Sequence, residues 1–264
     1  METVTAYIGA FAIGSILGLM GGGGSILTVP LLVYAVGINP VIATAYSLFI
    51  VGATSASGSI QNYYRNTINI KTGLIIAIPS FIGVYITRRY ILPALPGIVF
   101  DYNGLGIEKD TFIMVLFAVI MLLASISMLT GRIAADEDEP KKINFFYIVP
   151  GVGIIGLLMG LVGAGGGFLM IPMLVFFGGL PMKKAVGTSL FIIAINSLTG
   201  FVGDMQTINI DWEFLLSFTV VSVFGIFAGT YLQRFVNETQ LKRGFGWFIL
   251  LMAAFILSKE SSIF

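Results

Sequence analysis

The chain contains no cysteine and no histidine. Without cysteine it has no disulfide, no thiolate nucleophile and no thiol-ligated metal, and without histidine it has no imidazole base or imidazole metal ligand. We therefore expect no enzyme activity, no catalytic residues, no bound metal and no cofactor. The 14 basic residues nearly balance the 13 acidic ones, so the net charge does not indicate a nucleic-acid partner.

Charged side chains are also scarce. They make up 10% of the 264 residues, whereas 57% of the residues are hydrophobic. A soluble domain has about 25% charged and roughly 45–50% apolar residues. The polar side chains are too few to cover a soluble globule of this size, which predicts a protein embedded in a lipid bilayer.

Ten apolar segments follow one another along the chain, at about 5–20, 25–36, 41–60, 72–92, 111–131, 145–163, 168–178, 185–203, 212–232 and 245–258. Lipid cannot satisfy open backbone groups, so we expect every segment to be helical. A straight crossing needs about 20 apolar residues, and the segments 25–36 and 168–178 are much too short for one. The predicted fold class is an all-α polytopic membrane protein with about 8–10 transmembrane segments.

Two polar interruptions divide these segments. The tract RIAADEDEPKK at 132–142 is interpreted as a charged cytoplasmic linker between a first transmembrane repeat, 1–131, and a second, 143–264. The interruption at 93–110 is expected to be a surface excursion with a short helix of its own.

The two halves of the chain resemble each other. An ungapped shift of 142 residues aligns 14–52 with 156–194 and gives 16 identities in 39 positions. Biased composition explains matches among Leu, Ile and Val, but it does not align several glycines and a proline in register. The matched pairs include Gly18/Gly160, Gly21/Gly163, Gly23/Gly165, Gly24/Gly166, Pro30/Pro172 and Ser47/Ser189. We interpret the match as an internal duplication.

The positive-inside rule predicts how the two copies are related. If each half crosses the membrane an odd number of times, the second copy is inverted, and ten Lys and Arg residues share one side against four on the other. A parallel arrangement gives six against eight, which is no bias. The inverted arrangement is favoured, with both termini outside the cell membrane. Inverted repeats around glycine-interrupted helices are a recurring design of secondary transporters.

Each copy has a glycine cluster between an apolar helix and a short apolar segment. A glycine costs about 1 kcal/mol in a helix relative to alanine, so four in a row should break it. The break would leave free N–H groups at the start of a half-helix, where an anion can bind without a charged side chain. The alternative is close helix packing, which we prefer for Gly14, Gly18, Gly156 and Gly160. The predicted substrate-binding residues of the clusters are Gly21, Gly22, Gly23, Gly24, Ser25, Gly163, Ala164, Gly165, Gly166 and Gly167.

Neutral polar residues on the flanking helices are further candidates for the site. Their hydroxyl and amide groups can donate hydrogen bonds to a substrate, although Ser and Thr in membrane helices often bond to their own backbone instead. The candidates are Thr44, Ser47, Thr188, Ser189 and Asn196.

Charged residues at the helix ends are interpreted differently. We expect Arg88 and Arg89 to extend toward the membrane surface, although an anion pathway could use them. Asp204 is interpreted as a residue at the mouth of the protein or at an interface. Because no ionised side chain falls near the centre of a span, proton coupling through a buried carboxylate is not expected.

The paired stretches GLMGGGGSILTVPLL (18–32) and GLVGAGGGFLMIPML (160–174), followed by VIATAYSLFIV (41–51) and KAVGTSLFIIAINS (184–197), resemble the sulfite exporter TauE/SafE family of membrane permeases. The resemblance covers nearly the whole chain. It implies transport of sulfite, thiosulfate, sulfoacetate or related sulfur-containing anions across the cytoplasmic membrane.

These patterns predict a secondary transporter that moves a small anion by alternating access, with export as the direction. Its expected partners are the anionic substrate and the bilayer, with a homo-oligomer as a further possibility. A channel-like facilitator and a non-transporting membrane assembly or structural protein are the alternatives.

Overall fold

The computed structural model describes residues 2–102, 105–130, 145–163, 167–176, 178–205 and 208–261. The linker predicted at 132–142 lies outside these ranges. The first half contains α1 (Glu2–Met20), α2 (Gly23–Pro30), α3 (Pro40–Tyr64), α4 (Ile70–Ile86), α5 (Leu92–Ala94) and α6 (Lys109–Thr130). The second half contains α7 (Phe145–Val162), α8 (Gly167–Phe176), α9 (Met182–Asp204), α10 (Trp212–Leu232) and α11 (Glu238–Ser261). Short π-helical turns, Leu31–Ala35 and Thr87–Ile91, extend α2 and α4, and a 3-10 turn, Gln233–Phe235, follows α10.

Within the described residues, six helices are long and apolar enough to cross a membrane. They are Pro40–Tyr64, Ile70–Ala94, Lys109–Thr130, Met182–Asp204, Trp212–Phe235 and Thr239–Glu260. Shorter apolar helices cover Ala6–Met20, Gly24–Ala35 and Pro150–Val162. The chain is therefore a helical, multi-pass membrane protein.

The excursion after α4 is exposed over most of its described residues, as predicted, but a strand hairpin takes the place of the expected separate helix. The helix there, α5, has three residues, and most of the remainder is an antiparallel hairpin of β1 (Ile98–Tyr102) and β2 (Leu105–Glu108). Pro96 and Gly97 disfavour a continued helix, and the β-branched and aromatic residues that follow favour a strand.

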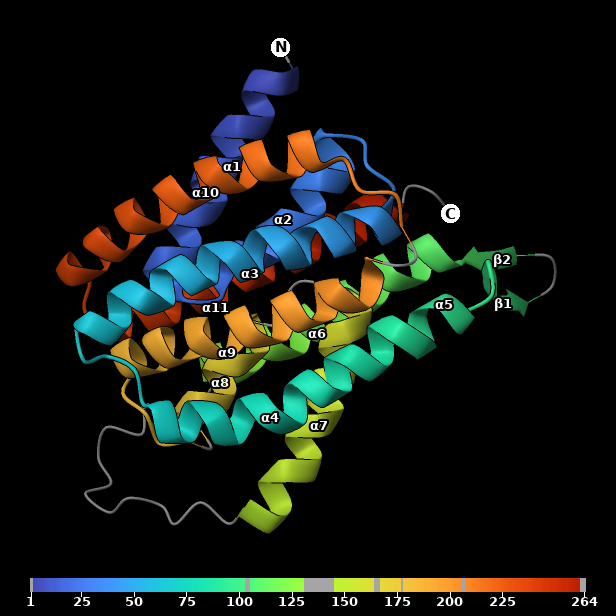
Figure 1. The fold of residues 1–264 in the computed structure, drawn as a ribbon. Coiled ribbons are helices and arrows are strands. Elements are labelled where there is room, and N and C mark those ends of the chain that lie inside the picture. The colour runs from blue at the N-terminus through green and yellow to red at the C-terminus, as the bar shows by residue number, and fades with distance from the viewer. Residues whose placement is uncertain are drawn as a thin grey trace.

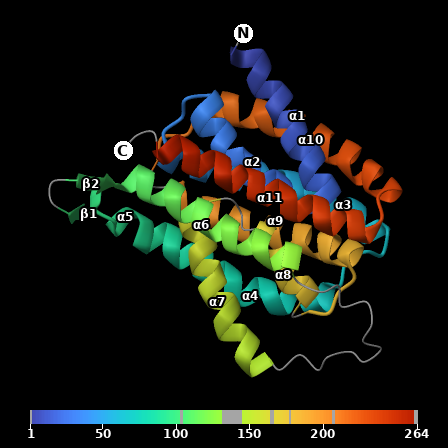
Figure 2. The same cartoon turned by 180° about the vertical axis from the view of Figure 1, so that it is seen from behind.

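Helices from the two halves pair with each other (Figures 1 and 2). α1 lies along α10, and α7 lies along α4. α3 packs on α9, and α6 packs on α11. A β-carbon added to Gly14 would overlap the carbonyl oxygen of Ser222, and one added to Gly156 would lie within contact distance of the carbonyl of Ser80. Close packing is therefore the confirmed role of these two glycines.

The 142-residue offset also relates backbone details. Gly21 and Gly163 adopt φ angles of +73° and +71°, and Gly37 and Gly179 adopt +77° and +59°. The loop after α2 has a bond from Ile38 N to Leu32 O of 2.9 Å, and the loop after α8 has one from Leu180 N to Leu174 O of 3.0 Å. Equivalent sequence positions thus fold into the same local structures.

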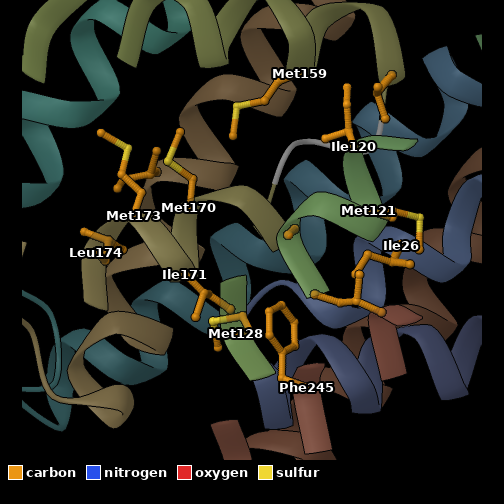
Figure 3. Close-up of a cluster of buried hydrophobic side chains, with 14 of the residues drawn as sticks. Ile26, Ile120, Met121, Met128, Met159, Met170, Ile171, Met173, Leu174 and Phe245 are labelled. Atoms are coloured by element: carbon orange, nitrogen blue, oxygen red, sulfur yellow. The ribbon is translucent and has the colours of Figure 1, made fainter. Parts of the chain in front are cut away.

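The largest buried apolar cluster surrounds α8 and is rich in methionine (Figure 3). Met159 and Met170 lie on one side of it, and Met121, Met128 and Phe245 contribute from α6 and α11. Unbranched, polarisable Met side chains can repack around a moving neighbour more readily than branched ones.

The two ends of the bundle differ in charge. One end, called the hairpin end, carries the β1–β2 hairpin, the start of α10 and the ends of α4 and α9; the other, called the basic end, carries the starts of α4 and α9 and the end of α10 (Figure 1). Described cations of the helix ends and loops at the basic end are Arg65, Lys71, Lys183, Lys184, Arg234, Lys242 and Arg243, and those of the hairpin end are Arg88, Arg89, Lys109 and Lys259.

Candidate functional site: two helix breaks that meet

Both glycine clusters interrupt a helix, as the sequence predicts. α1 ends at Met20, and Gly21 takes a φ of +73° before α2 begins at Gly23. Gly22 is the N-cap of α2, and no side chain caps that end. In the second half α7 ends at Val162, Gly163 takes a φ of +71°, and α8 begins at Gly167. The predicted site residues Ala164, Gly165 and Gly166 lie outside the described residues.

The two breaks meet inside the protein. A β-carbon added to Gly167 would lie 2.8 Å from the Cα atom of Gly22. The same β-carbon would lie 2.5 Å from the side chain of Ile193, which is the middle residue of α9. The start of α8 therefore touches the cap of α2 about halfway along a helix long enough to cross the membrane.

The first break rests on α9. A β-carbon at Gly21 would lie 2.7 Å from a methyl group of Val186 and 2.8 Å from Oγ of Ser189. The Ser189 hydroxyl lies 2.8 Å from the carbonyl of Val186 and 3.2 Å from the carbonyl of Gly21. Ser25 donates to the carbonyl of Gly22 at 2.6 Å. Both predicted hydroxyls thus bond to backbone around the break.

The second break rests on α3 in the equivalent way. A β-carbon at Gly163 would overlap Cβ of Thr44 and Nη2 of Arg88. The Thr44 hydroxyl donates to the carbonyl of Val41 at 2.8 Å and accepts from Arg88 Nη1 at 3.0 Å. The structure thus joins predicted residues of the cluster and of the flanking helix with an arginine.

Several buried hydroxyls on α3 and α9 have no hydrogen-bond partner in the part of the chain that the structure describes. Ser47, a predicted site residue, is one of them. Thr54, Ser55 and Ser197 are the others, and sequence reasoning missed them. The repeat itself carried a signal, because the 142-residue offset places Ser197 on Ser55. Unsatisfied buried donors in a native protein call for an explanation.

Two predicted residues lie apart from the breaks. The hydroxyl of Thr188 accepts from the backbone N–H of Asn69 at 3.0 Å, at the start of α4. The amide of Asn196 donates to Ser80 Oγ at 2.9 Å. Their roles in substrate binding stay predictions.

An ion pair lies beside the second break. The side chains of Arg88 and Asp204 are 0% and 4% exposed, and Arg88 Nη1 lies 3.1 Å from Asp204 Oδ2. The expectation that Arg88 extends toward the membrane surface is therefore wrong. Its side chain turns inward because Asp204 and Thr44 offer acceptors that lipid cannot. Asp204 is likewise buried against Arg88.

A cavity of about 200 Å³ adjoins this pair. It lies toward the hairpin end, between the starts of α3 and α6 and the ends of α4 and α9. Its lining residues are Val41, Ala45, Arg88, Leu92, Pro93, Lys109, Asp204 and Ile208.

Among the described residues, six helices long enough to span a membrane and two interrupted helices that meet at mid-helix define the general class, a polytopic α-helical membrane protein. The chain belongs to the sulfite exporter TauE/SafE family, whose model matches residues 6–256. The resemblance stated from the sequence is thereby confirmed.

Curated relatives carry the same general description. A probable membrane transporter protein of Xylella fastidiosa (strain 9a5c) is 30% identical over 93% of this chain and 91% of its own length. The probable membrane transporter protein YunE of Bacillus subtilis is 29% identical over 85% of each chain. A probable membrane transporter protein of Methanocaldococcus jannaschii, MJ0441, is 34% identical over 44% of this chain and 47% of its own. No solved structure matches the chain significantly.

Proposed function

We propose that this transporter exports a small sulfur-containing anion, such as sulfite, thiosulfate, sulfoacetate or another organosulfonate, across the cell membrane. The observation that carries the proposal is the contact between the two helix breaks, where Gly167 meets Gly22. The substrate class comes from the family to which the chain belongs.

The starts of α2 and α8 supply the chemistry for holding an anion. The first N–H groups of a helix have no partner within it, and the helix dipole adds partial positive charge there. No side chain caps α2. Two such ends at the same depth offer N–H donors to the oxygens of a sulfite or sulfonate group.

Alternating access is supported by the relation between the halves. Equivalent positive-φ glycines, equivalent helix crossings and equivalent loops recur at an offset of 142 residues. An inverted two-fold relation gives two conformations of similar energy, one open to each side. The methionine-rich surroundings of α8 in Figure 3 suit a hairpin that must repack as it moves.

The distribution of charge supports export. The basic end carries most of the described cations, and the positive-inside rule favours a cytoplasmic location for such an end. An inside-negative potential then favours outward movement of an anion by about 2.3 kcal/mol per charge per 100 mV. Export can therefore run on voltage without a proton relay.

The inverted topology predicts opposite sides for equivalent residues. Lys71 and Glu213 are each the second residue of their helix, α4 and α10, and both are exposed. Because the chain has no cysteine, Lys71→Cys and Glu213→Cys each create a single thiol. In intact cells, a membrane-impermeant maleimide should label Glu213→Cys at once and Lys71→Cys only after permeabilisation. Labelling of both from the same side would contradict the inverted arrangement.

Transport itself is tested by counterflow. Proteoliposomes loaded with unlabelled sulfite should accumulate external radiolabelled sulfite transiently, and internal thiosulfate or sulfoacetate should replace internal sulfite. A carrier saturates and shows this stimulation from the opposite side, whereas a pore shows neither. Absence of any sulfur-anion flux in sealed proteoliposomes would contradict the proposal and favour a non-transporting membrane protein.

A further inference from the structure

The guanidinium of Arg88 keeps part of its hydrogen-bonding capacity free although it is fully buried. Nη1 makes the bonds to Thr44 and Asp204, whereas Nε and Nη2 have no hydrogen-bond partner among the described residues. Arginine presents its donors as a planar fork that matches the spacing of two oxygens in a carboxylate or an oxyanion. Arg88 binds Asp204 through Nη1, and the second edge of the fork, Nε with Nη2, makes no hydrogen bond within the described residues.

The Arg88 side chain adjoins both the cavity and the second break. Arg88 lines the cavity of about 200 Å³, while Nη2 touches the position that a side chain of Gly163 would occupy. A water molecule fills about 30 Å³ of liquid, so the cavity has room for an oxyanion of a few heavy atoms. An anion entering from the hairpin end would meet this guanidinium before it reached the glycine break.

The charges that line the cavity also favour an anion. Arg88 and Lys109 contribute two positive charges, and Asp204 contributes one negative charge. Lys109 donates from Nζ to the carbonyl of Leu92 at 2.5 Å, an uncharged partner. The lining residues thus sum to one formal positive charge, of which the neighbouring Asp110 offsets a part through its interaction with Lys109.

The equivalent place in the other half has no ion pair among the described residues. The 142-residue offset places Thr230 on Arg88, and Asn62 on Asp204. There the Thr230 hydroxyl contacts Gln61, and Asn62 donates to the carbonyl of Gly58 at 2.9 Å. The cation nearby, Arg65, donates to the backbone carbonyl of Thr230 at 3.0 Å. The matching crossing therefore packs without a buried Arg–Asp pair, which distinguishes it from the crossing at the hairpin end.

We propose that Arg88 is a second anion-binding site, specific for oxyanions and sulfonates, at which the substrate binds the Nε–Nη2 edge in electrostatic competition with Asp204, the resident counter-ion. The inference rests on the proposed transport function. It adds to that function a side-chain binding site between the cavity at the hairpin end and the second glycine break. Asp204 neutralises the guanidinium when no substrate is bound to Arg88, and it competes with the substrate when one binds.

The test uses purified full-length protein and three probes: sulfite, thiosulfate and methanesulfonate, each against chloride at equal ionic strength. Asp204→Asn leaves Arg88 buried without its carboxylate, so the variant should unfold at a lower temperature in chloride. The oxyanions should restore that temperature, and sulfite should bind about tenfold more tightly than to the unmodified protein. Chloride restoring it as well, or no probe restoring it, would overturn the proposal.

A neutral pair separates binding from folding. Arg88→Gln with Asp204→Asn keeps side chains of similar size and leaves no buried charge unpaired, so it should fold. Its dissociation constant for sulfite should rise at least about tenfold, while Arg89→Gln, the matched control on the neighbouring residue, should bind as the unmodified protein does. An unchanged dissociation constant for sulfite in the double variant would overturn the proposal that Arg88 binds the anion. Sulfite binding without counterflow would contradict the proposed transport but not the proposed binding site at Arg88, so the two failures are distinguishable.

Discussion

Replacing Gly21 or Gly163 with alanine should abolish sulfite counterflow in a protein that still folds. Both residues have positive φ angles, where a β-carbon is strained by about 1–3 kcal/mol. At Gly21 the new methyl group would also press on Val186 and Ser189, and at Gly163 it would press on Thr44 and Arg88. The break would then shift away from the neighbouring helix, and the two half-helix ends would lose their alignment.

Gly37 and Gly179 provide matched controls for these variants. Their φ angles are +77° and +59°, and a β-carbon at either would meet nothing within 4 Å. Gly37→Ala and Gly179→Ala therefore have the same kind of backbone strain as Gly21→Ala and Gly163→Ala, but they do not displace a helix break. They should lose some thermal stability and retain counterflow. Equal counterflow in Gly21→Ala and Gly37→Ala would show that the break does not position the substrate.

Gly14→Ala should cause a large loss of stability without touching the site. α1 and α10 approach so closely there that a β-carbon would overlap the carbonyl oxygen of Ser222. Backbone cannot move aside as a side chain can, so we expect a loss of at least about 1–3 kcal/mol, the usual cost of overpacking. Thermal unfolding in detergent measures it.

Gly151 is the control for this substitution. It is an exposed residue in α7, and a β-carbon there would meet nothing within 4 Å. Gly151→Ala should leave the protein as stable as before or slightly more stable, since alanine favours a helix over glycine. If Gly14→Ala unfolds at the same temperature as Gly151→Ala, the two helices do not cross as closely as the structure has them.

Local composition was sufficient to predict the helical class and the two helix breaks. Scarce charge and long apolar segments determine a helical membrane protein, and four consecutive glycines cannot sustain a helix. The hairpin of β1 and β2 was missed because 93–110 was interpreted as a single polar interruption between two apolar segments. Its alternating residues, such as Ile98, Phe100 and Tyr102, carried the signal of a strand.

The site was only partly predictable. Gly21, Gly167 and Ser189 were predicted from patterns that lie within one copy of the repeat or recur in the other. The structure brings these residues together at the helix breaks. The pairing of Arg88 with Asp204 was missed because these residues are 116 positions apart, and it depends on how α4 packs on α9. The expectation that an arginine at a helix end extends to the membrane surface applies to a residue that faces lipid. It fails where the protein offers a buried carboxylate.

The most direct test of the central claim is to locate the bound anion. Selenite is a heavier analogue of sulfite, and its selenium can be placed by anomalous scattering in crystals of the full-length protein. The account predicts a peak between the starts of α2 and α8, within hydrogen-bonding distance of backbone N–H groups beside Gly22 and Gly167. Selenium found only elsewhere, with both half-helix ends empty at saturating selenite, would contradict it.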